Sequence, residues 1–170
     1  MQAAGAAFVA GSPAEPAGNE IRQRVDGGTS TLARSDRGAH VELTVRARGP
    51  VDPAEAWDRY LRPQRWSEWA PQIRRVRASA DTIAPGVTGT VHGPLPGLSV
   101  DFTVDAVDPE SMTWSWTVRA PFGIVLRLDH EIHPDDTGCG TSATIDGPAP
   151  VVLGYAPVAR YSLGRLVTLR

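Results

Sequence analysis

Residues 97–132 read GLSVDFTVDAVDPESMTWSWTVRAPFGIVLRLDHEI and alternate between apolar and polar residues in three successive segments. A period of two residues is typical of strands with one buried and one solvated face. Turns at Asp108-Pro109-Glu110 and Ala120-Pro121 separate the segments. The register predicts one shared inward face, made of Leu98, Val100, Phe102, Val104 and Ala106, then Met112, Trp114, Trp116 and Val118, then Phe122, Ile124, Leu126, Leu128, His130 and Ile132.

The length and composition set the domain organisation. A chain of 170 residues with 41% hydrophobic content can bury one sizeable core but is short for two domains. Residues 1–38 are rich in Ala, Gly, Pro and Ser without sustained periodicity, which predicts a disordered tail before a single domain over residues 39–170. No apolar run approaches the roughly 20 residues that span a bilayer. We therefore expect no membrane span and a cytoplasmic protein.

Charge and residue usage exclude several function classes. The formal net charge is -2, with 17 basic and 19 acidic residues spread evenly, so we expect no nucleic-acid partner. All the basic residues are arginine, which excludes Schiff-base and pyridoxal phosphate chemistry and the lysine of a P-loop. The single cysteine, Cys139, excludes an intrachain disulfide and a multi-cysteine zinc site, and we read it as a small residue in a Gly-flanked turn. His130 and His133 point to opposite faces of a strand, so we predict neither a metal site nor a cofactor.

The residues before this stretch predict one strand and two short helices. Residues 41–47 alternate as a first strand, and Asp52 then reads as the N-cap of a helix, with Pro53 at its first position and Glu55 completing a capping box. Pro63 ends that helix and opens a second short one that carries Trp66 and Trp69. Two more strands are expected, over residues 73–80 and around residues 87–91.

After the stretch we expect one more strand, through Ala143 and Ile145, and a C-terminal helix. Apolar residues recur at helical spacing from position 150 to position 169, which indicates an amphipathic helix. Pro157 lies inside it, removes one backbone hydrogen bond and clashes with the carbonyl of Leu153. This predicts a kink or break between residues 154 and 157.

This order of elements resembles the helix-grip fold of the START-like superfamily, also called the polyketide cyclase/dehydrase or SRPBCC superfamily. Three segments carry the resemblance: VDPAEAW at 51–57, WSEWAP at 66–71 and VDPE at 107–110. It covers roughly residues 40–169 and implies an α+β fold, in which a curved antiparallel sheet wraps a long C-terminal helix, with a cavity between them. The motifs specify a fold more than a reaction. Superfamily members include polyketide aromatases and cyclases, carriers of lipids and hormones, and co-chaperone-like binders.

If the apolar face of the three strands lines that cavity, the side chains suit a flat aromatic guest. Large rings bury much area, and tryptophan retains one N–H donor for a carbonyl. Alternatively, the same rings simply fill the core. The expected ligand-binding residues are Tyr60, Trp66, Trp69, Phe102, Trp114, Trp116 and Leu128.

His130 is the candidate catalytic residue, together with Tyr155. Burial favours a neutral imidazole, which could abstract an acidic α proton from a 1,3-diketone or polarise its carbonyl. These are the elementary steps of aldol cyclisation and dehydration. The alternative is a core histidine that is hydrogen-bonded to a neighbour.

Three hypotheses follow for the function. The first is a cofactor-independent polyketide cyclase or aromatase of bacterial secondary metabolism, of lyase or isomerase type. The second is a non-catalytic carrier or sensor of a lipid, isoprenoid or aromatic ligand. The third is a module that binds a protein partner through exposed aromatic residues at Trp66 and Trp69. In each case we expect a monomer or a homodimer.

Overall fold

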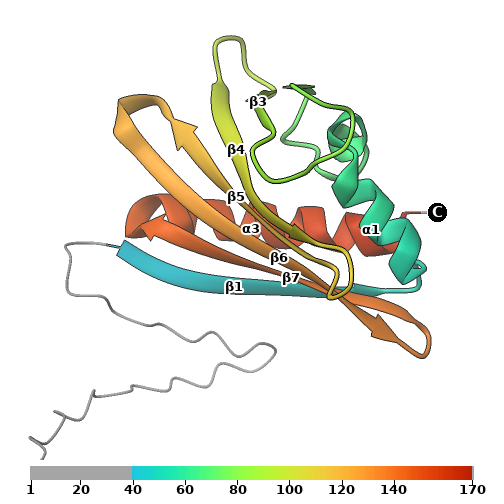
Figure 1. Cartoon of the computed structure of the whole chain (residues 1–170). Coiled ribbons are helices and arrows are strands. Elements are labelled where there is room, and N and C mark those ends of the chain that lie inside the picture. Colours follow the sequence, from blue (N-terminus) through green and yellow to red (C-terminus); the bar gives the residue numbers. More distant parts are fainter. Residues whose placement is uncertain (1–39, 170) are drawn as a thin grey trace, which may run out of the picture.

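The computed structural model describes residues 40–169. Within this range the chain forms a seven-stranded antiparallel sheet and a long C-terminal helix (Figure 1). The strands are β1 (His40–Gly49), β2 (Arg75–Ala78), β3 (Thr88–His92), β4 (Ser99–Asp108), β5 (Thr113–Ala120), β6 (Ile124–Asp135) and β7 (Gly138–Pro148). The helices are α1 (Pro53–Leu61), α2 (Trp66–Trp69) and α3 (Ala149–Thr168), with 3-10 turns η1 (Pro63–Arg65) and η2 (Pro121–Gly123). The predicted tail, residues 1–38, lies outside the described residues.

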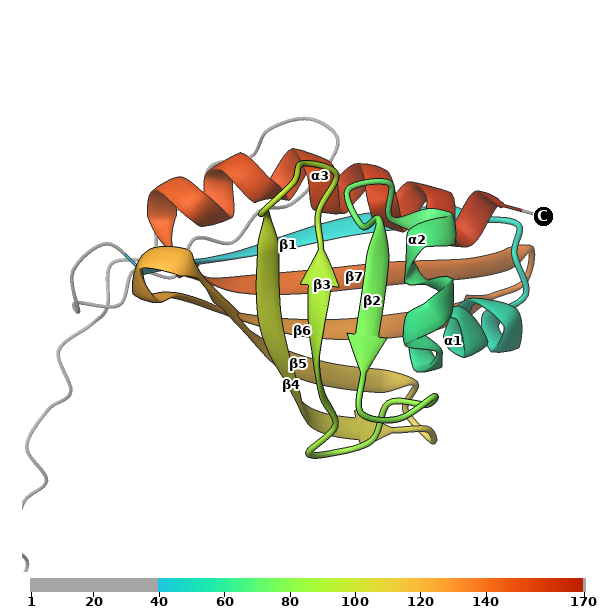
Figure 2. The ribbon, with the colours of Figure 1, turned by 90° about the horizontal axis from the view of Figure 1, so that it is seen from above.

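The sheet order is β1-β7-β6-β5-β4-β3-β2, so the first strand pairs with the last and the others follow as a meander. The sheet curves around α3, which lies along β1 and β7 (Figure 2). The short helices α1 and α2 stand together at one end of the sheet, and α2 contacts both β2 and α3. This is the helix-grip arrangement, and the predicted α+β fold class is confirmed.

Helix α1 begins with the N-cap and the first-position proline that its sequence predicts, but without the predicted capping-box bond. The Asp52 carboxylate accepts the backbone N–H of Ala54 at 2.8 Å, and Pro53 occupies the first helical position. Glu55 does not complete a capping box. Its Oε1 instead accepts hydrogen bonds from Arg59 at 3.0 Å and Arg65 at 2.8 Å, so it links α1 to the turn that precedes α2.

The register of β4 differs from the prediction because the strand contains a bulge. Phe102 and Val104 are buried as expected, but the pairing with β5 shifts between Val104 and Ala106. One extra residue inverts the alternation, so Ala106 is exposed and Val107 packs against the core. Leu98 precedes the strand and is also exposed.

Phe122 and Cys139 also differ from the prediction. Phe122 adopts a left-handed conformation with φ 65° in η2 and is fully exposed, whereas we expected it on the inward face. Cys139 lies within β7 rather than in a turn, and it is 1% exposed. Burial raises the pKa of its thiol, which favours the unreactive protonated form.

Helix α3 runs without a break across Pro157, so the break is wrong as one of the two predicted outcomes, a kink or a break. Pro157 and Leu153 both lie on the exposed side of the helix. The Leu153 carbonyl that loses its intrahelical donor is therefore open to solvent, which reduces the penalty of an interior proline.

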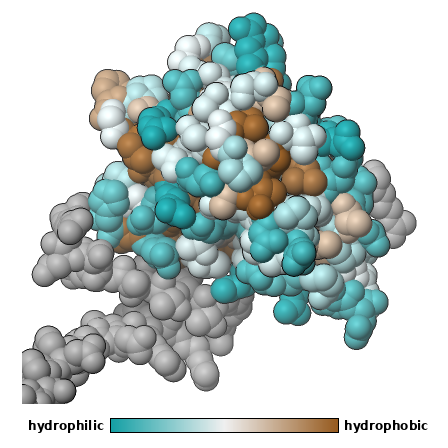
Figure 3. All heavy atoms as spheres, in the orientation of Figure 1, coloured by the Kyte–Doolittle hydropathy of each residue, from teal (hydrophilic) through white to brown (hydrophobic). Residues whose placement is uncertain are grey.

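The described helices include none that is both long and apolar enough to cross a membrane. The face of the molecule in Figure 3 is largely hydrophilic at its rim, with apolar residues gathered toward its centre. Among residues 40–169, the exposed large apolar side chains are Leu95, Leu98, Phe122, Val125, Leu153, Val158 and Tyr161.

Candidate ligand-binding site

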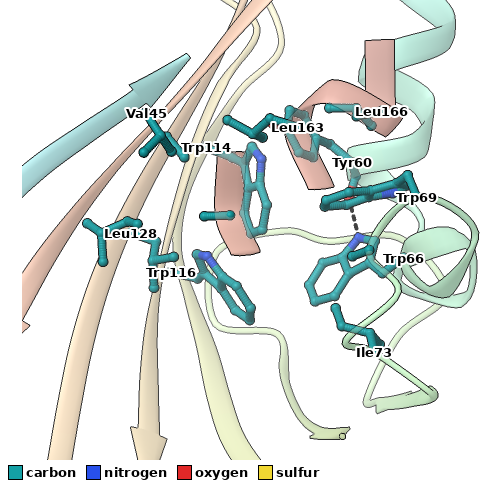
Figure 4. Close-up of a cluster of buried hydrophobic side chains, with 14 of the residues drawn as sticks. Val45, Tyr60, Trp66, Trp69, Ile73, Trp114, Trp116, Leu128, Leu163 and Leu166 are labelled. Atoms are coloured by element: carbon teal, nitrogen blue, oxygen red, sulfur yellow. Dashed lines mark hydrogen bonds between the residues drawn. The ribbon is translucent and has the colours of Figure 1, made fainter. Parts of the chain in front are cut away.

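Aromatic rings from α1, α2 and three adjacent strands form a continuous cluster beneath α3 (Figure 4). Trp114 and Trp116 lie on the same face of β5, with ring centroids 5.4 Å apart. Trp66 packs against both, at 5.6 Å and 5.2 Å. Trp66 and Trp69 are only 1% and 6% exposed, so the hypothesis that they form an exposed partner-binding surface is wrong.

A cavity of about 30 Å³ lies inside this cluster, between the sheet, α2 and α3. A single water molecule needs roughly 10–15 Å³ on this measure, so the cavity admits a group of that size but no ring. Its walls include seven of the predicted site residues, namely Trp66, Trp69, Trp114, Trp116, Leu128, His130 and Tyr155, together with Ala70, Gln72, Ile73, Ala143, Ala159, Ser162 and Leu163.

Two predicted ligand-binding residues lie behind the cavity wall. Phe102 packs against both Trp66 and Trp116, and its ring covers Gly89 of β3, where a Cβ atom would lie 2.6 Å from the ring. Tyr60 is fully buried, and its hydroxyl is hydrogen-bonded to the Thr141 hydroxyl at 2.8 Å. Both side chains support the wall without lining it.

His130 is held by the two tryptophans of the neighbouring strand. It lies opposite Trp114 in the β5–β6 register, and the two rings stack with centroids 4.6 Å apart and an interplanar angle of 10°. The Trp116 indole donates its Nε1–H to Nε2 of His130 at 3.1 Å. Because indole nitrogen can only donate, Nε2 must be the unprotonated nitrogen, and Nδ1 carries the proton of the neutral ring.

Burial among apolar groups lowers the pKa of His130 to about 3. The ring is therefore neutral across the physiological range, as the sequence predicts. However, its accepting nitrogen is already occupied by Trp116, and its other nitrogen is a donor. A general base works best with a pKa near the operating pH, so His130 is poorly suited to abstract a proton.

Tyr155 reaches the cavity from α3 in the company of two residues that the sequence did not single out. Ser162 donates a hydrogen bond to Oε1 of Gln72 at 2.8 Å, and hydrogen bonding to Gln72 also counteracts the increase that burial causes in the pKa of Tyr155. Ser162 lies seven positions after Tyr155, which is two helical turns, so helical spacing could have identified it. Gln72 follows Pro71 in a turn, where no periodicity marks it.

Residues 39–168 match the family described as "Polyketide cyclase / dehydrase and lipid transport". The chain belongs to this family. A solved structure titled "Crystal structure of Ara h 8.0201" is similar over 74% of this chain and 95% of that chain, with a TM-score of 0.59 and 13% identity. At this identity the similarity supports the fold alone. No curated protein matches the chain.

Family membership supports ligand binding and the superfamily that the sequence indicated, but no particular reaction.

In the described part of the chain, no group of three or more His, Cys, Asp or Glu side chains lies together as possible metal ligands. His130 and His133 are separated as the strand register predicts: His130 is buried, whereas His133 is half-exposed and contacts Glu131 and Ser142.

Proposed function

We propose that the protein binds a hydrophobic, at least partly aromatic small molecule between the sheet and α3, and that it serves as a carrier or sensor. The observation that carries the proposal is the cavity itself, whose walls are aromatic rings with a few buried polar groups. Such walls stack on flat guests and orient them through single hydrogen bonds. The lipid-transport part of the family description supports the same class of ligand.

The chemistry of the walls favours binding over catalysis. Among the residues that line the cavity, His130 alone has a side chain with a basic nitrogen, and none has a carboxylate. Its Nε2 is occupied by Trp116, and Tyr155 is kept protonated because burial raises its pKa. The site therefore lacks a group that can accept a proton from a bound substrate near neutral pH.

A second candidate is the cofactor-independent polyketide cyclase or aromatase of secondary metabolism. One observation favours it: the Nδ1–H of His130 is buried without a partner, so it would be available to polarise the carbonyl of a substrate that displaces part of the wall, without giving up its proton. Neutral imidazole can serve as such an electrophile. Tyr155 would then orient the substrate, and the shape of the cavity would bring its reacting carbons together.

Native mass spectrometry of the purified full-length chain tests the proposal directly. We expect a retained guest of defined mass, and the same spectrum distinguishes a monomer from a homodimer. Ala159→Leu should fill the cavity and abolish the retained mass, because Ala159 lines it. Ala156→Leu is the matched control, since Ala156 is buried on α3 outside the cavity wall. The proposal is wrong if no guest is retained and no aromatic compound binds on titration.

A guest with rings needs more room than the present cavity offers, so its binding must displace part of the wall.

For the enzyme candidate, turnover of a polyketone is compared between the natural protein and His130→Phe, with binding measured separately. Loss of turnover at unchanged affinity favours the cyclase, whereas loss of affinity alone favours the carrier.

A further inference from the structure

We propose that the protein carries a second binding site, for a phosphate monoester with a small apolar group, where β2, β3 and β4 lie side by side at the edge of the sheet (Figure 2). The site is a pocket of about 400 Å³, which is within the usual size range of small-molecule sites. It shares no lining residue with the cavity beneath α3, so it is separate from the site of the proposed function.

The strand register places three polar side chains of the pocket in one row. Arg75 of β2 pairs with His92 of β3, and His92 pairs with Ser99 of β4. Residues directly opposite each other in antiparallel strands point to the same face, with Cβ atoms about 4.5–5.5 Å apart. Val91, in the adjacent row, is buried in the core, so the row of Arg75 points to the outer face. All three side chains of this row line the pocket.

The loop of residues 93–98, between β3 and β4, supplies the apolar part of the wall. Two backbone bonds fix its shape, from the Gly93 N–H to the Leu98 carbonyl at 2.8 Å and from the Leu98 N–H to the Leu95 carbonyl at 3.1 Å. Gly97 turns the chain with φ 81°, a conformation that favours glycine. Leu95 and Leu98 are 67% and 47% exposed, so an apolar surface lies beside the polar row.

Two arginines make the pocket cationic. Arg74 and Arg75 both line it and are exposed, and the backbone N–H of Arg74 donates to the His92 carbonyl at 2.8 Å. Among the described residues neither arginine forms an ion pair, whereas Arg59 and Arg65 pair with carboxylates. None of the described residues that line the pocket has a carboxylate. Neighbouring cations without a counter-ion repel each other, and a bound oxyanion offsets that repulsion.

The two guanidinium groups, rather than His92, are assigned the contacts with the anion. Nε2 of His92 is closed off from solvent and has no partner among the described residues, so this nitrogen cannot reach a ligand. We therefore treat the imidazole as part of the floor. The arginine side chains are exposed and can turn toward an anion in the pocket.

The charge and the shape of the pocket favour a phosphate monoester. Guanidinium groups bind both carboxylates and phosphates through parallel N–H bonds. A phosphate monoester carries about −1.5 to −2 charges at pH 7, which matches two unpaired arginines, whereas a carboxylate carries only one charge. The exposed Leu95 and Leu98 offer a surface to the apolar group that the phosphate carries.

Nuclear magnetic resonance titrations of the ¹⁵N-labelled full-length chain test the site with phenyl phosphate, inorganic phosphate, benzoate and benzyl alcohol. Phenyl phosphate should shift the amide signals of residues 93–99 and bind at least about fivefold tighter than phosphate or benzoate. Benzyl alcohol should leave these signals unchanged.

The same titrations can overturn each part of the assignment. Equal shifts with benzyl alcohol overturn the anion site. Equal affinity for benzoate overturns the choice of phosphate, and equal affinity for inorganic phosphate overturns the apolar part of the site. If phenyl phosphate shifts none of residues 93–99, the second site is wrong, whereas the proposed function stands because its cavity lies elsewhere.

Arg75→Gln should weaken the binding of phenyl phosphate by at least about fivefold. Arg77→Gln is the matched control, because Arg77 lies on the same strand in the next row, beside Thr90 and Asp101, and does not line the pocket. Its affinity should stay within about twofold at about 0.15 M salt. An equal loss in both variants would show that the charge of the whole face, rather than the pocket, attracts the anion.

Salt provides a test that needs no variant. The affinity of the natural protein for phenyl phosphate should fall as sodium chloride rises from about 50 mM to about 300 mM, because salt screens exposed charges. If Arg75→Gln does not fold, this measurement decides, since an affinity independent of salt overturns the role of the arginines.

Discussion

Trp116 of β5 and His130 of β6 are joined by a 3.1 Å hydrogen bond between Nε1 and Nε2, on the face of the sheet that looks toward α3. The bond spans two neighbouring strands diagonally, since Trp116 pairs with Leu128 and His130 pairs with Trp114. It fixes the tautomer of the histidine and aligns its ring on Trp114. A polar bond within the aromatic cluster thus sets which nitrogen of His130 carries the proton.

Trp116→Phe should leave Nε2 of His130 buried without a donor. We expect a loss of about 1–3 kcal/mol in the free energy of unfolding, measured with a chemical denaturant, because an unsatisfied buried acceptor loses its hydration without compensation. The ¹⁵N chemical shifts of the natural protein should show a neutral His130 protonated at Nδ1. Protonation at Nε2 in the natural protein would contradict the assigned bond.

The free energy of unfolding should decrease as the pH is lowered, because of His130. Its pKa is about 3 in the folded protein and about 6.5 in the unfolded chain, so the unfolded state binds the extra proton between these values. The stabilisation is therefore complete above pH 6.5 and is lost as the pH falls toward 3, by about 2 kcal/mol between pH 6.5 and pH 5. Denaturation series at pH 7, 6 and 5 measure it.

His130→Phe removes this titration and should flatten stability between pH 7 and pH 5. The pKa values of Glu55 and Asp58 are lowered mainly by hydrogen bonds from Arg65 and Arg62, and their stabilisation is lost only at lower pH, below their unfolded pKa values near 4. An equally steep slope in His130→Phe would show that another group is responsible.

Arg59→Met should destabilise the protein by about 2–4 kcal/mol. The guanidinium is 6% exposed and donates to the backbone carbonyls of Leu166 at 2.7 Å and Leu169 at 2.9 Å, so it satisfies the C-terminal end of α3. Amide hydrogen exchange should accelerate in the last turn of α3. Arg62→Met is the control: its exposed side chain forms a single ion pair with Asp58, and the change should stay within about 0.5 kcal/mol.

Gly89→Ala and Gly154→Ala should have opposite effects. A methyl group at Gly89 would overlap the Phe102 ring and the Arg77 carbonyl, which predicts a loss of about 2 kcal/mol or more. At Gly154, on the exposed side of α3, the methyl group meets nothing within 4 Å, and alanine should stabilise the helix by up to about 1 kcal/mol. Thermal unfolding distinguishes the two, and an unaffected Gly89→Ala would show that β3 can move away from Phe102.

The sequence predicted the fold where periodicity is strong and failed where backbone detail intervenes. The alternation of β5 and β6 placed Trp114, Trp116 and His130 on one face, and the structure brings them into contact. The bulge after Val104 was not predicted, because Asp105 and Ala106 continue the alternation of polar and apolar residues through it.

The sequence predicts most of the residues that gather at the candidate site, but not which of them line the cavity or how they are hydrogen-bonded. Helical spacing indicates that Tyr60 is buried and strand alternation indicates the same for Phe102, yet only the packed structure shows that both stand behind the cavity wall. The bond between Trp116 and His130 forms only with particular side-chain rotamers, which sequence periodicity does not encode. It changes the interpretation of His130 from a proton acceptor to a hydrogen-bond donor.

The attachment of α3 at both ends affects the kinetics of binding. The helix follows β7 without a loop, and Arg59 holds its last turn, so α3 cannot swing outward as a rigid body. The four-residue α2 and the turn after it are held to α3 through two side-chain bonds, from Arg165 to the Glu68 carbonyl at 2.9 Å and from Ser162 to Gln72. We therefore expect the association and dissociation rates of a guest to depend on how often this short segment detaches, rather than on movement of the long helix.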